Sequence, residues 1–271
     1  MTGVLEATVL GCGSSGGVPR ADGDWGVCDP NEPRNRRRRC SLLVRRKRAD
    51  GGEGPETTVL VDTSPDFREQ AIDARIGRLD GILFSHDHAD QSHGIDDVRA
   101  FFIRQRARID AWMDAETRAS LTRKFDYIFE SQGGYPAILE AHDLPPHGEP
   151  WRIDGPSGPI PISSFDMEHG AIRCVGFRFG NVAYSPDVNG LPAAAWEALD
   201  GVDTWIVDAL RHTPHPTHAH LEQTLQWVRR AKPRRTILTN MHIDMDFNAL
   251  RASLPPGVEP AYDGLTLEVG L

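Results

Sequence analysis

Short apolar runs rich in β-branched residues recur along this chain, and polar residues or glycine end each of them. Runs of this kind, about four to eight residues long, are typical of buried β-strands. We expect strands at residues 4–10, 41–44, 57–61, 81–84, 172–179, 182–184, 205–207 and 236–239. Apolar residues with helical spacing occur at 94–106, 115–129 and 221–231, so the sequence predicts a mixed α/β fold.

The 271 residues contain no biased linker and no internal repeat that would divide them. We therefore expect a single domain, residues 1–271, with a helical insertion at about 101–141. Clusters of proline, glycine and polar residues predict loops at 20–39, 49–56 and 144–161.

Composition limits the compartment and the partners of the protein. No apolar stretch approaches the roughly 18 residues of a membrane span, and the first residues lack the order of a signal peptide, so we expect a cytoplasmic protein without membrane contact. The 4 cysteines are scattered, which favours reduced thiols. The formal net charge of −9 argues against a general polyanion-binding protein, so large nucleic acids are not expected as partners.

The most informative stretch directly follows the strand predicted at 81–84 and reads Ser-His-Asp-His-Ala-Asp-Gln-Ser-His-Gly. Residues two apart in an extended segment project to one side, so His86 and His88 can bind one cation while Asp90 reaches an adjacent position. The alternative is a solvated start of a helix, a role that Asp96 and Asp97 are expected to fill in part.

Further candidate ligands stand next to other predicted strands, because a catalytic metal needs at least three protein ligands. They are His169, Asp187 and His242. Taken singly, each histidine is more often an ordinary residue than a ligand, and Asp187 after Pro186 is more often a turn residue. Only their joint placement favours a metal site.

Several motifs together resemble those of metallo-β-lactamase-fold hydrolases over nearly the whole length. They are Gly-Cys-Gly-Ser-Ser-Gly-Gly-Val-Pro at 11–19, Val-Asp-Thr-Ser-Pro-Asp at 61–66, the histidine cluster with Gly-Ile-Asp at 94–96, His-Gly at 169–170, Tyr-Ser-Pro-Asp at 184–187 and Asp-Gly at 263–264. Within that superfamily the chain is most similar to the branch that contains the phosphoribosyl cyclic phosphodiesterase of phosphonate degradation; the tRNA 3′-processing endonucleases are more distant. The resemblance implies an αββα sandwich of two mixed sheets with flanking helices and metals at one edge.

The resemblance also implies a ligand set. The first metal would be held by His86, His88 and His169, and the second by Asp90 and His242, with Asp187 bridging. Gln91 stands where the family has a further histidine, so it could bind through its amide oxygen, pass the position to a water, or leave the second site partly empty. Nitrogen and oxygen ligands suit Zn²⁺ or Mn²⁺, and we expect one or two ions per chain.

A second departure concerns the structural zinc site of the relative. Only Cys28 stands in the corresponding loop, and Met245 occupies the place of its histidine, so we expect no structural zinc.

A histidine-rich stretch at 212–220 precedes the helix predicted at 221–231. By resemblance to the related phosphodiesterase, His218 is the expected general acid, with His220 as the fallback, and Asp90 is counted with them among the catalytic residues. Asp62 and Asp208 each end a buried strand, where they could accept the N–H of a metal-ligating imidazole and fix its tautomer; ordinary turns are an equal alternative.

Two other motifs admit competing interpretations. The spacing G-x-G-x-x-G at 11–16 would suggest a dinucleotide site only if a helix followed, and residues 17–24 are typical of a loop instead. The arginine-rich run at 34–39 favours a solvated loop over a nucleic-acid patch, although one of its arginines could bind a substrate phosphate.

These observations favour a metal-dependent phosphodiesterase that acts on a small cyclic or nucleotide-like phosphodiester. Two alternatives stay open: a thioester or lactam hydrolase of the same fold, and a non-catalytic metal-binding or nucleotide-binding module in which Gln91 marks the loss of chemistry. A homodimer is a possible assembly.

Overall fold

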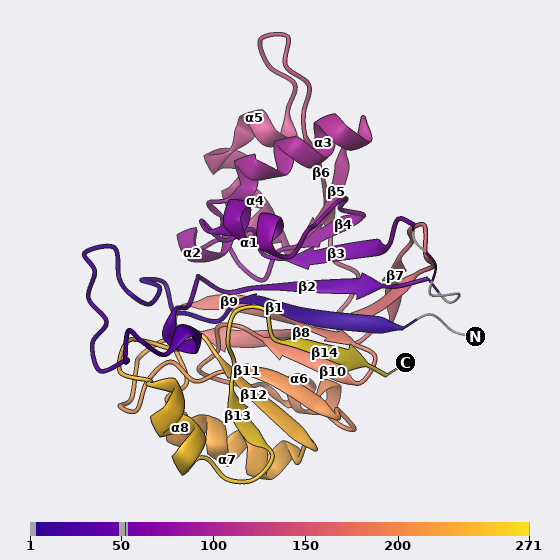
Figure 1. Ribbon diagram of the computed structural model, residues 1–271. Coiled ribbons are helices and arrows are strands. Elements are labelled where there is room, and N and C mark those ends of the chain that lie inside the picture. The colour runs from indigo at the N-terminus through magenta and orange to yellow at the C-terminus, as the bar shows by residue number, and fades with distance from the viewer. Residues whose placement is uncertain (1–3, 49–51, 53, 271) are drawn as a thin grey trace.

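The computed structural model describes residues 4–48, 52 and 54–270, and its strands form two seven-stranded sheets (Figure 1). The first sheet has the order β14 (Thr266–Val269), β1 (Leu5–Gly11), β2 (Ser41–Arg46), β3 (Thr57–Val61), β4 (Gly81–Leu83), β5 (Ile109–Met113) and β6 (Leu139–Asp143). Strands β3 to β6 run parallel to one another, and the others pair antiparallel.

The second sheet has the order β13 (Val258–Pro260), β12 (Arg235–Thr239), β11 (Thr204–Asp208), β10 (Val182–Ser185), β9 (Ile172–Phe179), β8 (Ile160–His169) and β7 (Trp151–Ile153). Here β10 to β13 are parallel, and β7 to β10 pair antiparallel. Both sheets are therefore mixed, as the resemblance implies.

The main core lies between the two sheets. Val9 and Val59 of the first sheet belong to the same buried cluster as Phe177 and Ile206 of the second. Because successive side chains of a strand point to opposite faces, the neighbour of Ile206, Trp205, belongs to a different cluster on the outer face. Each sheet thus buries apolar side chains on both faces.

Helices cover the two outer faces and complete the four layers. The first sheet is covered by α1 (Phe67–Asp73), α2 (Ala89–Ser92), α3 (Arg99–Gln105), α4 (Ala115–Lys124) and α5 (Asp126–Phe129), seen in the upper part of Figure 1, with the short 3-10 helix η2 (Ile95–Val98) beside them. The second sheet carries α6 (Ala193–Ala198), α7 (Leu221–Ala231) and α8 (Phe247–Ser253). In α7, Leu221, Leu225 and Val228 repeat at helical spacing and pack on the core.

Several segments differ from the sequence expectation. The expected helical insertion at 101–141 contains strand β5 and the start of β6, which extend the first sheet. The expected loop at 144–161 contains β7 and the start of β8, and the helix expected at 115–129 is interrupted at Phe125. Part of the loop expected at 49–56 lies outside the described residues.

The arginine-rich run is not a solvated loop throughout, contrary to expectation. Arg37 is 1% exposed and donates from Nη2 to the carbonyl oxygen of Met245 at 2.7 Å. Its neighbours Arg38 and Arg39 form ion pairs with Asp263 and Asp66. Through these contacts, residues 37–39 connect segments of the chain that are far apart in the sequence.

The glycine-rich stretch after β1 is followed by turns and irregular backbone, and the next helical element is the short 3-10 helix η1 (Pro33–Asn35). A dinucleotide-binding helix therefore does not start there. Among the described residues, no helix combines the length and the apolar character that a membrane crossing needs.

Candidate metal centre

The candidate site lies at one edge of the sandwich, where strands of both sheets end. Within each sheet the parallel strands bring their carboxyl ends to the same edge: β3 and β4 in the first, and β10, β11 and β12 in the second. The residues at or just after these ends are Asp62, His86, Asp187, Asp208 and His242. Loops that follow parallel strands commonly build sites for this reason.

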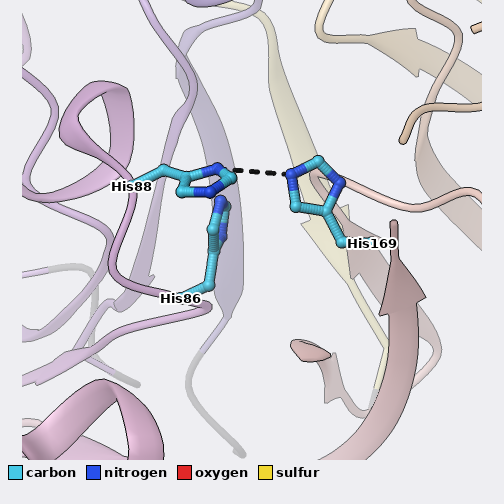
Figure 2. A group of neighbouring side chains, drawn as sticks. All are labelled: His86, His88 and His169. Carbon is cyan, nitrogen blue, oxygen red and sulfur yellow. Dashed lines mark hydrogen bonds between the residues drawn. The ribbon is translucent and has the colours of Figure 1, made fainter. Parts of the chain in front are cut away.

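Three histidines converge there, two from the loop after β4 and one from the end of β8. The nitrogens of His86, His88 and His169 that could bind a metal all lie within 4.8 Å of one another. Figure 2 shows their rings turned toward one another, with the contact of 3.3 Å between His88 Nδ1 and His169 Nε2 drawn as a dashed line. His86 and His169 are buried, whereas His88 is exposed. The site is therefore reachable from solvent through His88.

His86 is oriented by a chain of hydrogen bonds that starts at Asp62. The hydroxyl of Ser85 donates to Asp62 Oδ2 at 2.8 Å and lies 3.0 Å from His86 Nδ1, so it can accept the imidazole N–H. This arrangement leaves the Nε2 lone pair of His86 for the site, and Nε2 is buried without a hydrogen-bond partner. Asp62 thus contacts the histidine through Ser85, whereas we expected direct acceptance of an imidazole N–H.

His169 is oriented from the opposite side of the site. Its Nδ1 lies 2.7 Å from the carbonyl oxygen of Thr217, which can only accept, so Nδ1 carries the proton. Burial, with a further contribution from the charge of His218, lowers the pKa of His169 to about 4. Burial also holds the pKa of His86 well below its ordinary value. Both rings are therefore neutral near pH 7, the form that binds metals.

Asp187 is buried beside these histidines. Its Oδ2 lies 3.8 Å from His86 Nε2 and 3.9 Å from His169 Nε2. Burial raises the pKa of Asp187 well above its ordinary value; His218 opposes this rise, and the negative charges of Asp90 and other carboxylates add to it. Burial outweighs the positive charge of His218, because it removes the water that would stabilise the ionised form of the carboxyl group.

These contacts fit a divalent cation. Bond lengths of about 2.0–2.2 Å place the ligand atoms of a tetrahedral zinc about 3.4 Å apart. The separations of 3.3, 3.8 and 3.9 Å among His88, His169, His86 and Asp187 are close to that spacing. Such an ion would bind the unpartnered nitrogen of His86 and would stabilise the ionised form of the buried Asp187.

His218 lies next to this group. Its ring centroid is 4.6 Å from that of His169, and its Nδ1 lies 2.9 Å from Asp208 Oδ2 and 4.0 Å from Asp187 Oδ2. His169, Asp187 and His218 also form a second set with ligand atoms within 4.8 Å of one another. Asp208 therefore contacts an imidazole directly, but this imidazole belongs to His218, the expected general acid, rather than to an expected metal ligand.

Opposing effects set the protonation of His218. Burial alone would lower its pKa, but the nearby carboxylates of Asp208, Asp187 and Asp90 outweigh burial and raise the pKa to about 9. His218 therefore carries a proton at neutral pH. His220, the fallback acid, precedes α7 and belongs to neither group of possible metal ligands in the described part of the chain.

The residues expected at a second metal do not converge in the same way. Asp90 acts on Asp187, Asp62 and His218 through its charge, and it is absent from both ligand groups among the described residues. Gln91 is buried and donates from Nε2 to Asp187 Oδ1 at 3.0 Å. His242 Nε2 lies 2.6 Å from Arg20 Nη2.

An adjacent helix fixes the loop that carries His86 and His88. Lys124 Nζ of α4 donates to the Asp87 carbonyl oxygen at 2.9 Å and to its Oδ2 at 2.7 Å, and the hydroxyl of Ser120 also bonds that carboxylate. The segment expected as an insertion therefore supports the site.

Sequence reasoning missed several residues that shape this centre, namely Ser85, Thr217, Arg20 and Lys124. Ser85 stands directly before His86, so its place next to a ligand was a usable signal. Thr217 acts through its backbone carbonyl, which no side-chain pattern reveals. Arg20 and Lys124 are distant from the ligands in the sequence, and only the tertiary structure brings them to the site.

Known proteins share this architecture. Residues 57–243 match the beta-lactamase superfamily domain. The chain is similar to a protein whose crystal structure is described as that of a new diphosphatase from the PhnP family, with 34% sequence identity, a TM-score of 0.83 and 98% of each chain covered. It is also similar to Zn(2+)-bound PqqB from Methylobacterium extorquens, with 15% identity, a TM-score of 0.71, and 97% of this chain and 99% of that chain covered. At that identity the second similarity shows the fold alone.

A further relative carries a different name. A protein from Porphyromonas gingivalis named octanoyltransferase is 27% identical over 266 residues, which are 96% of this chain and 51% of that protein. This chain therefore spans about half the length of that relative.

Proposed function

The chain belongs to the metallo-β-lactamase superfamily, and on that premise we propose that it is a metal-dependent hydrolase of small cyclic or nucleotide-like phosphodiesters. One observation carries the proposal: His86, His88 and His169 converge with Asp187 at the sandwich edge, beside a protonated histidine held by Asp208. Such a site combines a place for a cation with a proton donor.

The cation would be held by the three histidines and by Asp187. A bound divalent ion supplies Lewis acidity and lowers the pKa of water toward neutrality. Ligands of nitrogen and oxygen suit Zn²⁺ or Mn²⁺. Ser85 and the Thr217 carbonyl oxygen keep the two buried imidazoles in the tautomer that directs Nε2 toward the cation.

His218 would supply the proton that a leaving oxygen needs. Asp208 holds Nδ1, so Nε2 is the nitrogen available to a substrate. With a pKa of about 9 the ring is protonated at neutral pH and can act as a general acid, an effect typically worth about 10²- to 10⁴-fold in rate. His218 would return to the protonated form by taking up a proton from water.

The comparisons support phosphorus over an acyl carbon as the centre attacked. The diphosphatase relative aligns over 98% of both chains, whereas the octanoyltransferase aligns over only 51% of its own length. An esterified phosphorus of a diphosphate and the phosphorus of a phosphodiester each carry two substituted oxygens, so the same acid and cation would serve both. An octanoyl thioester is accordingly the appropriate competing substrate in a test.

The test measures metal content and turnover in the same samples. Metal-replete protein is expected to hydrolyse bis(p-nitrophenyl) phosphate and to leave an octanoyl thioester intact. His88→Ala should lose the metal and the turnover, whereas His212→Ala, an exposed histidine of the 212–220 stretch, should retain both.

Three outcomes would contradict the proposal. Thioester turnover without phosphodiester turnover would favour the acyl hydrolase. Bound metal without either activity would favour a binding module. If His88→Ala binds as much metal as the unsubstituted protein, the proposed set of metal ligands is wrong.

A further inference from the structure

Gln91 faces the carboxylate that would have to be shared by two metals. Its amide lies 3.0 Å from Asp187 Oδ1, and both side chains are buried. The amide donates from Nε2 to this oxygen, and its own oxygen, Oε1, is buried without a hydrogen-bond partner. One oxygen of Asp187 is therefore held by a hydrogen bond, and the other, Oδ2, faces His86 and His169.

His242, the other residue expected at a second metal, is engaged on both ring nitrogens. Its Nδ1 lies 3.0 Å from Asp244 Oδ1, and its Nε2 lies 2.6 Å from Arg20 Nη2. A guanidinium only donates, so Nε2 accepts through the lone pair that a metal would need. The positive charge next to His242 is thus already supplied by Arg20.

The Arg20 side chain lies beside an acidic residue and the glycine-rich stretch. Its Nη1 lies 3.6 Å from Asp24 Oδ2, and a side-chain carbon added at Gly16 would lie 3.4 Å from Arg20 Cγ. That distance is an ordinary van der Waals contact, so the Arg20 side chain lies against the glycine-rich stretch. The side chain of Arg20 is 43% exposed, so its remaining N–H groups are accessible from solvent.

Resting on the proposed function, we propose that the chain holds one cation, at His86, His88, His169 and Asp187, and that Arg20 takes the place of a second. Its guanidinium would bind the unsubstituted oxygens of the substrate phosphate, which it can contact through two parallel N–H groups. Gln91 and Arg20 together make the centre mononuclear: the amide holds Asp187 Oδ1, and the guanidinium holds His242 Nε2.

Metal content per chain tests the first half. Protein is equilibrated with excess Zn²⁺, freed of unbound metal by gel filtration and analysed by mass spectrometry. We expect one zinc per chain in the unsubstituted protein and in Gln91→His, Arg20→Ala and the control Arg108→Ala, an exposed arginine between α3 and β5. The double variant Gln91→His with Arg20→Ala should bind two, with circular dichroism confirming that it is folded.

Each other result would overturn the inference. Two zinc ions in the unsubstituted protein would contradict the mononuclear centre but not the proposed function. No bound zinc would contradict both. Two in Arg20→Ala alone would show that Gln91 ligates through its oxygen. Two in Gln91→His alone would show that Arg20 does not block the position, and one in a folded double variant would show that these residues do not exclude the second ion.

Phosphate binding tests the second half without turnover. Calorimetric titration of zinc-loaded protein with inorganic phosphate should give a Kd about 10- to 100-fold weaker for Arg20→Ala than for the unsubstituted protein, with Arg108→Ala unchanged. Arg20→Lys should recover part of the loss, because it restores the charge without the paired donors. Equal affinities in Arg20→Ala and Arg108→Ala would refute the phosphate contact.

Discussion

Replacing Asp208 by asparagine isolates the charge that keeps His218 protonated. The carboxylate accepts from His218 Nδ1 at 2.9 Å, and an asparagine carbonyl can accept the same bond without the negative charge. Burial lowers the pKa of His218, and the neighbouring carboxylates, Asp208 foremost, raise it to about 9. The substitution should therefore shift this pKa down toward the ordinary imidazole value of about 6.5.

The size of the effect follows from the two pKa values. At pH 8 a group with a pKa of about 9 is about 90% protonated, and one with a pKa of about 6.5 is about 3% protonated. Asp208→Asn should then lower turnover up to about 30-fold at pH 8 and by less than about twofold at pH 6. Activity that needs the protonated acid is retained below the pKa and lost as the pH rises through it, so the alkaline limb of the profile moves to lower pH.

The assay is a pH–rate profile with a phosphodiester whose leaving group is a poor one, because a nitrophenolate needs no proton. Metal content is measured at each pH, and Asp154→Asn, an exposed aspartate, serves as the control. An equal loss at pH 6 and pH 8 with unchanged metal content would refute the reasoning, since Asp208 would then only position the ring. Loss of metal from the variant would instead place His218 among the ligands.

Two further predictions concern the support of the site and of the fold. Ser85→Ala removes the hydroxyl between Asp62 and His86 and should weaken metal affinity about 10- to 100-fold in competition with a chromophoric chelator; unchanged affinity would contradict the proposed orientation of the ring. Arg37→Leu leaves the Met245 carbonyl oxygen without its buried donor and should lower the free energy of unfolding in urea by about 1–3 kcal/mol, whereas the exposed Arg36→Leu should stay within about 0.5 kcal/mol; equal effects of the two would contradict the structural role of Arg37.

The sequence pattern was sufficient to predict the helices and strands whose buried residues recur at a regular local spacing. The strands expected at 57–61 and 172–179 and the helix expected at 221–231 have the observed bounds. The two strands are rich in β-branched and other apolar residues, and the helix repeats apolar residues at helical spacing. Strands β5 and β6 were not expected, since they lie in a segment dominated by helical spacing. They form because the first sheet offers a parallel edge next to β4.

The sequence by itself also supplied the types of side chain at the site, since imidazoles and carboxylates next to strand ends favour a metal. Which of them meet was decided by the tertiary structure alone. Gln91 and Asp187 are 96 residues apart, and Arg20 and His242 are 222 residues apart. Local periodicity carries no information over such separations, because a hydrogen bond depends on which strands end at the same edge and how their loops pack. That packing joined Gln91 to a carboxylate and Arg20 to an imidazole.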